Sequence, residues 1–271
     1  MGWAGALSAL REPITRTFGE LRWESAPLAS PHTPVLGVVL YLGVIFGLQR
    51  IMRDRAPFKL RYATVVHNAF LCALSAAMCI GTLLALAFRV ASLDDGFMCI
   101  VCDRQEHAMT GDLLWWMYIF YASKYYEVLD TVIMVLKKKP LNFLHVYHHA
   151  VVMCLFWAYM QSNMVIHWIL IVANSFVHVL MYYYYGMSAM YPGIKIWWKK
   201  YITMIQIVQF VVDLTSTWPF PFLYFSSLGC RGSMRGWVFG QLVGMSFFKL
   251  FSDLYRKNYK GDSASKQKQL S

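Results

Sequence analysis

Long apolar stretches recur along this chain, and they limit its possible folds more than any other feature of the sequence. A helix rises 1.5 Å per residue, so about 20 apolar residues are needed to cross about 30 Å of hydrocarbon. Backbone polar groups in hydrocarbon must be satisfied within the spanning segment, which favours helices. Seven stretches are candidate spans: Pro34–Met52, Tyr62–Phe88, Asp112–Leu136, Phe143–Met160, Met164–Tyr185, Tyr201–Phe220 and Met234–Tyr255.

The composition agrees with a membrane protein. Residues of the apolar set AVILMFWYC make up 58% of the chain and charged residues only 14%, against about 25% charged residues in a typical soluble domain. So few charges cannot cover the surface of a water-soluble globule. We therefore exclude a soluble enzyme, a disordered chain and a secreted disulfide-rich scaffold. We predict an all-α polytopic membrane protein with seven transmembrane helices.

Charges between the stretches predict the orientation in the membrane. The loop at 53–61 is basic, the loop at 89–112 is acidic, and Lys137–Lys139 are basic again. Basic loops preferentially face the cytosol. Only the loop that carries Arg231 and Arg235 departs from the alternation. The N-terminus is then lumenal or external, and the C-terminus is cytosolic.

These predictions divide the chain into three parts. A lumenal segment at 1–33 precedes a seven-helix domain at 34–255 and a basic cytosolic tail at 256–271. The net charge of +11 is attributed to juxtamembrane Lys and Arg that attract anionic lipid, and not to nucleic-acid binding. Three apolar residues of the first segment share a helical face that is typical of a short interfacial helix: Ile14, Phe18 and Leu21.

Polar and ionisable side chains lie inside four of the predicted spans. An ionised group at the centre of a bilayer costs about 3 kcal/mol or more, so such residues are functional-site candidates. Steps of three and four residues place the candidates of each span on one helix face. They are Lys124, Glu127, Asp130 and Thr131 in the third span, His145, His148 and His149 in the fourth, Asn174 and His178 in the fifth, and Thr203, Gln206 and Gln209 in the sixth.

The four polar groups lie at a similar depth. At 1.5 Å per residue they lie roughly 9–12 Å inside the cytosolic ends of their helices, as judged from Asp130, His148, His178 and Gln206. The sequence therefore predicts an enclosed polar chamber that opens toward the cytosol. His67 stands apart from this group, and a lone intramembrane histidine is more often a partner in a helix–helix hydrogen bond.

The histidine pattern leaves two chemistries open. The HxxHH pattern at His145–His149 also occurs in di-iron membrane desaturases, but those enzymes need several such boxes, whereas this chain has one box among eight histidines. A histidine-box metalloenzyme with a single zinc ion on His148, His149 and His178 remains an alternative. A seven-span transporter or receptor shares the topology but does not account for histidines beside carboxylates.

Covalent catalysis is the alternative that we favour, without a metal or other cofactor. A neutral imidazole attacks thioesters, and the resulting acyl-imidazole stays reactive. Nearby carboxylates can orient the rings, and burial excludes water that would hydrolyse the intermediate. Basic cytosolic residues suit the phosphates of coenzyme A. The residues predicted for this contact are Lys137, Lys138, Lys139, Lys199 and Lys200.

Four sequence motifs carry a resemblance to a known family. KYYEVLDT at Lys124–Thr131 is similar to KxxExxDT, and HVYHH at 145–149 matches HxxHH. NSFVHVLMYYYY at 174–185 is similar to NxxxHxxMYxYY, and TMIQIVQF at 203–210 to TxxQxxQF. In this order, the motifs resemble those of the fatty-acid elongase (ELO) family.

The resemblance implies a fold and an activity. The fold is six helices in an inverted barrel around a substrate tunnel, with the seventh span outside. The activity is that of a very-long-chain 3-oxoacyl-CoA synthase of the endoplasmic reticulum membrane. Such an enzyme condenses a long-chain acyl-CoA with malonyl-CoA and releases CO₂ and coenzyme A. Besides membrane lipid, the implied candidate partners are the reductases and dehydratase of the elongation cycle and a second copy of the chain.

The resemblance also implies roles for the motif residues. His148 would be the nucleophile and would touch the reacting carbon together with His178, while Lys124 would pair with carboxylates. Orienting and tuning roles fall to His145, His149, Asn174, Glu127 and Asp130. The remaining motif residues would line the chamber and bind substrate: Thr131, Met181, Tyr182, Tyr185, Thr203, Gln206 and Gln209.

Three cysteines lie in loops that the topology places on the lumenal side. Cys99 and Cys102 fall between the second and third spans, and Cys230 falls between the last two. Because the lumen is oxidising, cysteines there tend to pair. We predict a disulfide from Cys230 to Cys99 or Cys102. A Cys99–Cys102 bridge, or a shared zinc ion with His107, is the alternative.

Overall fold

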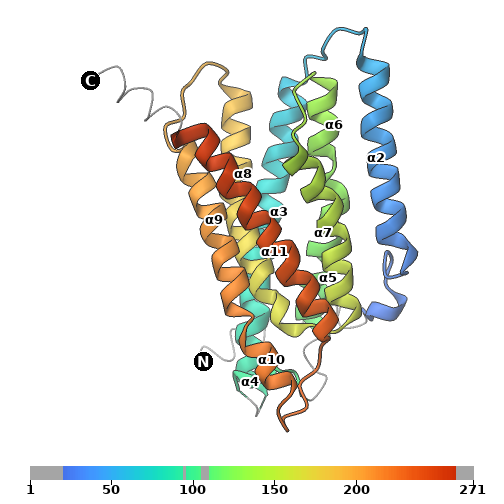
Figure 1. Ribbon diagram of the computed structural model, residues 1–271, viewed down its shortest axis with the longest axis vertical. Coiled ribbons are helices and arrows are strands. Elements are labelled where there is room, and N and C mark those ends of the chain that lie inside the picture. Colours follow the sequence, from blue (N-terminus) through green and yellow to red (C-terminus); the bar gives the residue numbers. More distant parts are fainter. Residues whose placement is uncertain (1–20, 94–95, 105–109, 261–271) are drawn as a thin grey trace, which may run out of the picture.

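The computed structural model describes residues 21–93, 96–104 and 110–260. Regular structure in these ranges is helical, without a strand, which confirms the all-α prediction. Most of the expected interfacial helix and most of the basic tail lie outside the described residues. The long helices are α2 (His32–Met52), α3 (Arg61–Ser92), α5 (Gly111–Glu127), α6 (Leu129–Leu136), α7 (Phe143–Gln161), α8 (Trp168–Met190), α9 (Lys199–Ser216) and α11 (Met234–Tyr255) (Figure 1).

Shorter helical segments connect the long ones. They are α4 (Met98–Val101), α10 (Pro219–Tyr224), 3₁₀ turns at Trp23–Ser25 and Val165–His167, and a π-helical turn at Arg256–Lys260.

Four helical segments among the described residues are long and apolar enough to cross a membrane. They are α2, α3, α7 and the continuous segment Val165–Met190 that includes α8. The chain is therefore a multi-pass membrane protein. The other long helices pack beside these four, and α9 carries Lys199, Lys200 and Asp213. That all seven predicted spans cross the membrane stays a prediction.

Two predicted spans differ from the helices that form. The third span is two helices, because the Thr131 amide donates to the Val128 carbonyl over 3.1 Å and so tightens the chain to a 3₁₀-type turn between α5 and α6. The helix of the sixth predicted span, α9, ends at Ser216 and not at Phe220. Pro219 has no amide hydrogen to continue α9, but it suits the first position of α10.

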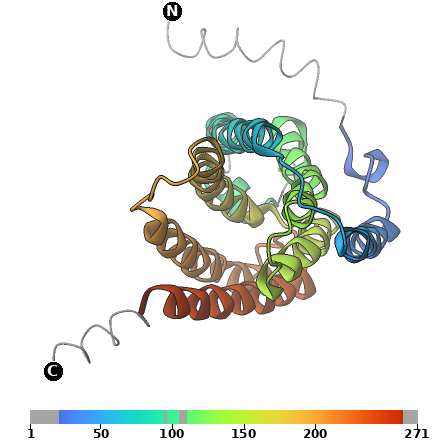
Figure 2. The same cartoon turned by 90° about the horizontal axis from the view of Figure 1, so that it is seen from above.

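Six helical positions close a ring in the order α3, α5, α7, α11, α9 and α8, and each neighbouring pair is in contact. Figure 2 shows this ring from above, with α2 outside it. α2 packs against α6 and α7. The span outside the ring is therefore the first, whereas the resemblance places the seventh outside; here the last helix, α11, closes the gap between α7 and α9.

An apolar core fills the end of the ring at which α5 and α8 begin and α7 ends. Phe120, Phe156 and Met160 are among its fully buried side chains, with the rings of Phe120 and Phe156 4.6 Å apart in an edge-to-face contact. Residues before α2 are anchored there, because Tyr121 and Trp157 donate to the Leu28 and Ala29 carbonyls over 3.0 and 2.9 Å. This end corresponds to the predicted lumenal side.

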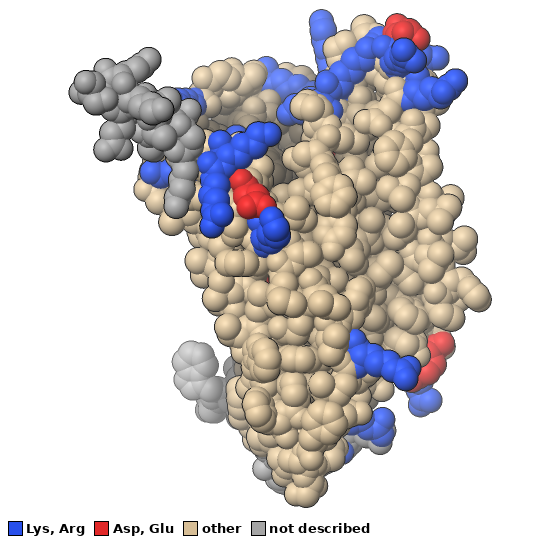
Figure 3. Space-filling model, viewed as in Figure 1, with Lys and Arg blue, Asp and Glu red and all other residues tan. Residues whose placement is uncertain are grey.

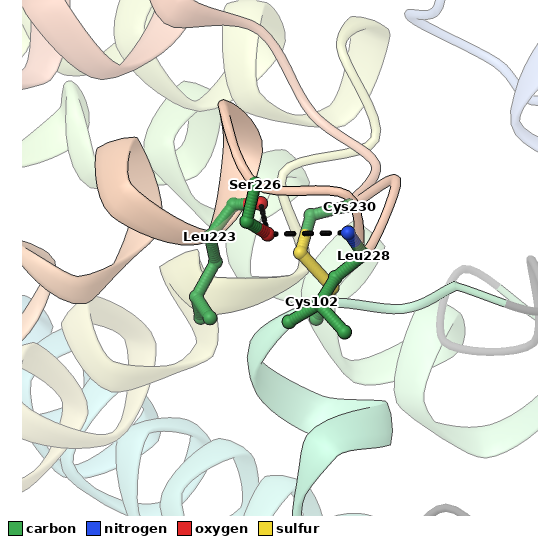
Figure 4. The surroundings of a disulfide bond; sticks show 5 residues. All are labelled: Cys102, Leu223, Ser226, Leu228 and Cys230. Atoms are coloured by element: carbon green, nitrogen blue, oxygen red, sulfur yellow. Dashed lines mark hydrogen bonds between the residues drawn. A yellow bond between two sulfur atoms is a disulfide. The ribbon is translucent and has the colours of Figure 1, made fainter.

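A disulfide ties the two loops at the same end. Cys102 is bonded to Cys230, which lies 128 residues later in the chain, with their Cα atoms 4.6 Å apart. The Arg231 amide donates to the Cys102 carbonyl over 3.0 Å. Figure 4 shows the turn before Cys230, where Ser226 Oγ accepts from the Leu228 amide over 3.2 Å. Cys102, and not Cys99, is thus the partner of Cys230, which also excludes a Cys99–Cys102 bridge. His107 lies outside the described residues.

Candidate active site

A cavity of about 900 Å³ occupies the end of the ring opposite the disulfide. Figure 3 shows Lys and Arg gathered at this end, while the middle of the same face is almost free of charge. The predicted residues that line the cavity are Glu127, Asp130, Lys137, Lys139, His145, His148, His149, Asn174, His178, Met181, Tyr182, Tyr185, Lys199, Thr203, Gln206 and Gln209. The predicted residues that do not line it are Lys124, Thr131, Lys138 and Lys200.

Lys124 and Glu127 form a buried ion pair at the edge of the cavity, which Glu127 lines. Lys124 Nζ lies 2.7 Å from Glu127 Oε1, and each residue is only 1% exposed. Ser123 Oγ donates to the same carboxylate oxygen over 2.8 Å, and Lys124 Nζ also donates to Asn174 Oδ1 over 3.4 Å. The spacing of three residues on one helix brings the pair together, and the hydrogen bonds offset the cost of burying two charges.

Asp130 connects three helices at the side of the chamber. Its Oδ1 atom lies 2.9 Å from His67 Nε2 of α3, and its Oδ2 atom accepts from the Tyr182 hydroxyl of α8 over 2.9 Å. His67 also stacks on Tyr126, with ring centroids 5.4 Å apart. From the sequence, His67 is expected only to make a helix–helix contact. His67 does make such a contact, and it also lines the cavity.

The sequence contains a signal that would have identified the α3 wall. Thr64, His67 and Asn68 stand at i, i+3 and i+4, and all three line the cavity. Tyr41 of α2 is a second residue that sequence reasoning missed. Its hydroxyl lies 3.0 Å from Thr131 Oγ1, which in turn lies 2.8 Å from His145 Nε2. The helix outside the ring, α2, thus reaches the histidine box through two hydroxyls in series, those of Tyr41 and Thr131.

The remaining histidines face one another inside the chamber. The His149 ring lies 4.6 Å from the His145 ring and 5.3 Å from the His148 ring, measured between centroids. On the facing helix, His178 Nδ1 lies 3.9 Å from Glu127 Oε2, which is too far for a hydrogen bond. Glu127 Oε2, His149 Nδ1 and His178 Nδ1 are buried without a hydrogen-bond partner among the described residues.

The beginning of α7 is positioned by its cap. Asn142 precedes the helix, and its Oδ1 atom accepts from the His145 amide over 2.7 Å. The cap satisfies one of the free amides of the first turn and thereby sets the register of the HxxHH box. No group of three or more His, Cys, Asp or Glu among the described residues is arranged to hold a metal ion.

Basic side chains surround the mouth of the cavity. Burial lowers the pKa of Lys137, and the nearby Lys139 lowers it further. Lys137 Nζ donates to Thr64 Oγ1 over 3.3 Å, whereas Lys138 Nζ is drawn away to the Arg53 carbonyl. Lys59 and Arg61 also line the mouth, although the sequence analysis did not assign them to it.

The fold and the site together define a class: a multi-pass helical membrane protein with a buried histidine–carboxylate chamber and a basic mouth. The chain matches the family described as "ELO: GNS1/SUR4 family" over residues 26–268, and it belongs to this family.

Individual relatives agree with this assignment. The chain is 38% identical over 264 residues to "Fatty acid elongase A" of Dictyostelium discoideum, covering 95% of this chain and 94% of that one. It is 37% identical over 252 residues to "Fatty acid elongase sre1" of the same organism, with 91% of each chain covered. It is also 30% identical over 272 residues to "Very long chain fatty acid elongase 4" of Macaca mulatta, covering 91% of this chain and 77% of the relative.

Proposed function

We propose that this protein is a condensing enzyme of fatty-acid elongation. It joins a long-chain acyl-CoA to malonyl-CoA and forms a 3-oxoacyl-CoA two carbons longer, with release of CO₂ and coenzyme A. The observation that carries the proposal is the position of His178 beside Glu127, with His148 lining the same buried chamber, which has a basic mouth. Family membership and the names of the relatives support the same activity.

The reaction proceeds in two half-reactions. In the first, an imidazole nitrogen of His148 attacks the thioester carbon, the C–S bond breaks, and coenzyme A leaves with the proton that the imidazole releases. In the second, malonyl-CoA loses CO₂, and the resulting carbanion attacks the acyl carbon. The new C–C bond forms as the C–N bond to His148 breaks, and the departing imidazole takes up one proton from solvent, which restores neutral His148. Separating one difficult step into two easier ones is the general advantage of covalent catalysis.

His178 and Glu127 assist these steps. His178 Nδ1 and Glu127 Oε2 have no hydrogen-bond partner among the described residues, so they are available to substrate or to the proton in transit. The ion pair with Lys124 holds the Glu127 carboxylate in place. The Asp130 carboxylate orients Tyr182, and Thr131 orients His145. No step needs a metal ion, and we expect chelators to leave the activity unchanged.

The architecture suits this reaction. The six-helix ring forms a barrel around the substrate tunnel, with α2 outside. The enzyme resides in the endoplasmic reticulum membrane with a lumenal N-terminus and a cytosolic C-terminus. Lys137, Lys139 and Lys199 at the mouth then meet the phosphates of coenzyme A from the cytosol. The enzymes that reduce and dehydrate the 3-oxoacyl product are the partners expected in the same membrane.

The test is to incubate the purified enzyme with acyl-CoA alone. We expect one equivalent of coenzyme A to be released per active site, together with an enzyme species heavier by the acyl group. The variant His148→Ala should give neither. Asp253→Asn, at an exposed pair with Lys249, is the matched control and should behave as wild type. Release that strictly requires malonyl-CoA would contradict the covalent route and favour a ternary complex.

A further inference from the structure

A second, smaller cavity of about 50 Å³ adjoins the chamber on the side of the apolar core. It lies between α7, α8, α9 and α11. Four residues line both cavities, so the two adjoin here: His148, Asn174, Gln209 and Phe210. An acyl group attached near His148 would therefore lie next to this side cavity, with only shared side chains between them.

Two glycines bring α11 close to this cavity. A Cβ atom on Gly240 would lie 1.7 Å from the Tyr159 hydroxyl, and one on Gly244 would lie 2.9 Å from Leu214 Cδ2. Both glycines line the cavity. Small residues four positions apart allow close helix contact in a membrane. The backbone of α11 therefore forms one wall of the cavity, and there is no room for a larger side chain at Gly240.

One carboxylate in the wall lacks a partner. Asp213 is 9% exposed, and its Oδ2 atom accepts from Gln209 Nε2 over 3.0 Å. Its Oδ1 atom is buried without a hydrogen-bond partner among the described residues. Two polar neighbours are engaged, because Gln241 Nε2 donates to Thr217 Oγ1 over 2.8 Å and Thr217 Oγ1 donates to the Asp213 carbonyl over 3.2 Å. Lys124 and Tyr159 also line this cavity.

The surroundings select the kind of group that can reach Asp213. Most of the wall is apolar, and it includes Leu155, Phe156, Val243 and Phe247. A charged group would lose its hydration here without gaining enough polar partners. A single neutral hydrogen-bond donor on an otherwise apolar chain fits both the wall and the unpartnered oxygen. A hydroxyl substituent on an acyl chain has this chemistry.

We propose that the side cavity is a subsite for hydroxylated acyl chains, with Asp213 Oδ1 as the hydroxyl acceptor. The proposal rests on the proposed function, because it needs the acyl carbonyl at His148. Asp213 lies one helical turn, about 6 Å, beyond Gln209 on the same face of α9. The hydroxyl must therefore lie at a fixed distance along the chain from the thioester. A hydroxyl elsewhere on the chain would not reach Asp213 Oδ1.

The experiment measures kcat/KM for elongation of a series of acyl-CoAs of one length, in which the hydroxyl is moved carbon by carbon, with the unsubstituted acyl-CoA as reference. For wild type we expect a maximum at one position, about tenfold above its neighbours. The variant Asp213→Leu should remove the maximum, since no acceptor remains. Asp213→Asn retains an acceptor oxygen and should keep part of the maximum. The control Asp253→Asn should keep the maximum in full.

The outcomes separate the two proposals. If wild type does not elongate the unsubstituted acyl-CoA, the proposed function is wrong. If it elongates that substrate but shows no positional maximum, the subsite is wrong, because water then satisfies Asp213. A maximum that survives in Asp213→Leu would also overturn it. The preference is a ratio of kcat/KM values for one protein, so partial loss of folded protein does not affect it. The wild-type series tests the positional maximum without any variant.

Discussion

The two ends of the helix ring differ in what holds them together. The end with the disulfide is packed with apolar side chains and is tied by the bond from Cys102 to Cys230. The opposite end surrounds a cavity of about 900 Å³, and polar contacts such as those of Asp130 with His67 and Tyr182 join its helices. Packing and a covalent link thus stabilise one end, while the other keeps its polar groups available for chemistry.

This contrast explains how an open chamber can be built within a membrane. Each buried polar group at the open end is costly unless it has a partner, and four that line the cavity lack one among the described residues: Asn68 Oδ1, Glu127 Oε2, His149 Nδ1 and His178 Nδ1. Their helices continue into the apolar end, where α5, α7 and α8 are held together by the core. Stability at the closed end therefore offsets the cost of the unpaired polar groups at the open end.

The largest effect is expected from a change that abolishes chemistry at the open end and leaves the closed end intact. His148→Ala removes the nucleophile, and elongation should fall by about 10⁴-fold or more. Thermal unfolding in detergent should change little, because His148 makes ring contacts but no hydrogen bond that the structure shows. Residual activity above about one per cent would show that another group is the nucleophile.

The next largest effect concerns the closed end. Cys230→Ser opens a loop of 128 residues, which in the chain-entropy model is worth about 4–5 kcal/mol of unfolding free energy. We expect a lower melting temperature, with kcat per folded molecule close to wild type. Cys79→Ser, on α3 outside any disulfide, is the control. A free thiol at Cys230 in freshly isolated wild-type protein would contradict the bond.

A smaller loss of stability is expected from the open end. Lys124→Met leaves Glu127 buried without its cation, which should cost about 3–5 kcal/mol of unfolding free energy. In the double variant Lys124→Met/Glu127→Gln no unpaired charge remains, so much of the lost stability should return. A double-mutant cycle on thermal unfolding measures this coupling. Strictly additive effects would show that the pair does not act as a unit.

The smallest effect is expected at the mouth of the chamber. Lys137 is charged below its pKa, and burial and Lys139 lower that pKa. As the pH rises, Lys137 should therefore lose its charge earlier than an ordinary lysine, and KM for acyl-CoA should rise by up to about fivefold. Arginine stays charged, so Lys137→Arg should remove this alkaline rise. Identical KM profiles for the two proteins would exclude a role for this charge.

Local patterns in the sequence determined the helices and the level of the chamber. Spacings of three and four residues place Lys124 next to Glu127 and put three histidines on one side of α7, because a helix repeats every 3.6 residues whatever lies around it. Motif residues on α6, α7, α8 and α9 do converge on one cavity. Loop position also identified Cys230 as a bonding residue, but could not choose between Cys99 and Cys102.

Only the tertiary structure decided which helices are neighbours. His67 meets Asp130 across 63 residues of sequence, and Tyr41 meets Thr131 across 90. The same packing leaves α2 outside the ring, brings α11 into it, and places Asp213 beside a cavity. Periodicity shows which side of a helix is polar, but not which helix that side will face. That choice depends on side-chain shape at every contact, such as Gly240 against Tyr159, and these contacts exist only in the assembled bundle.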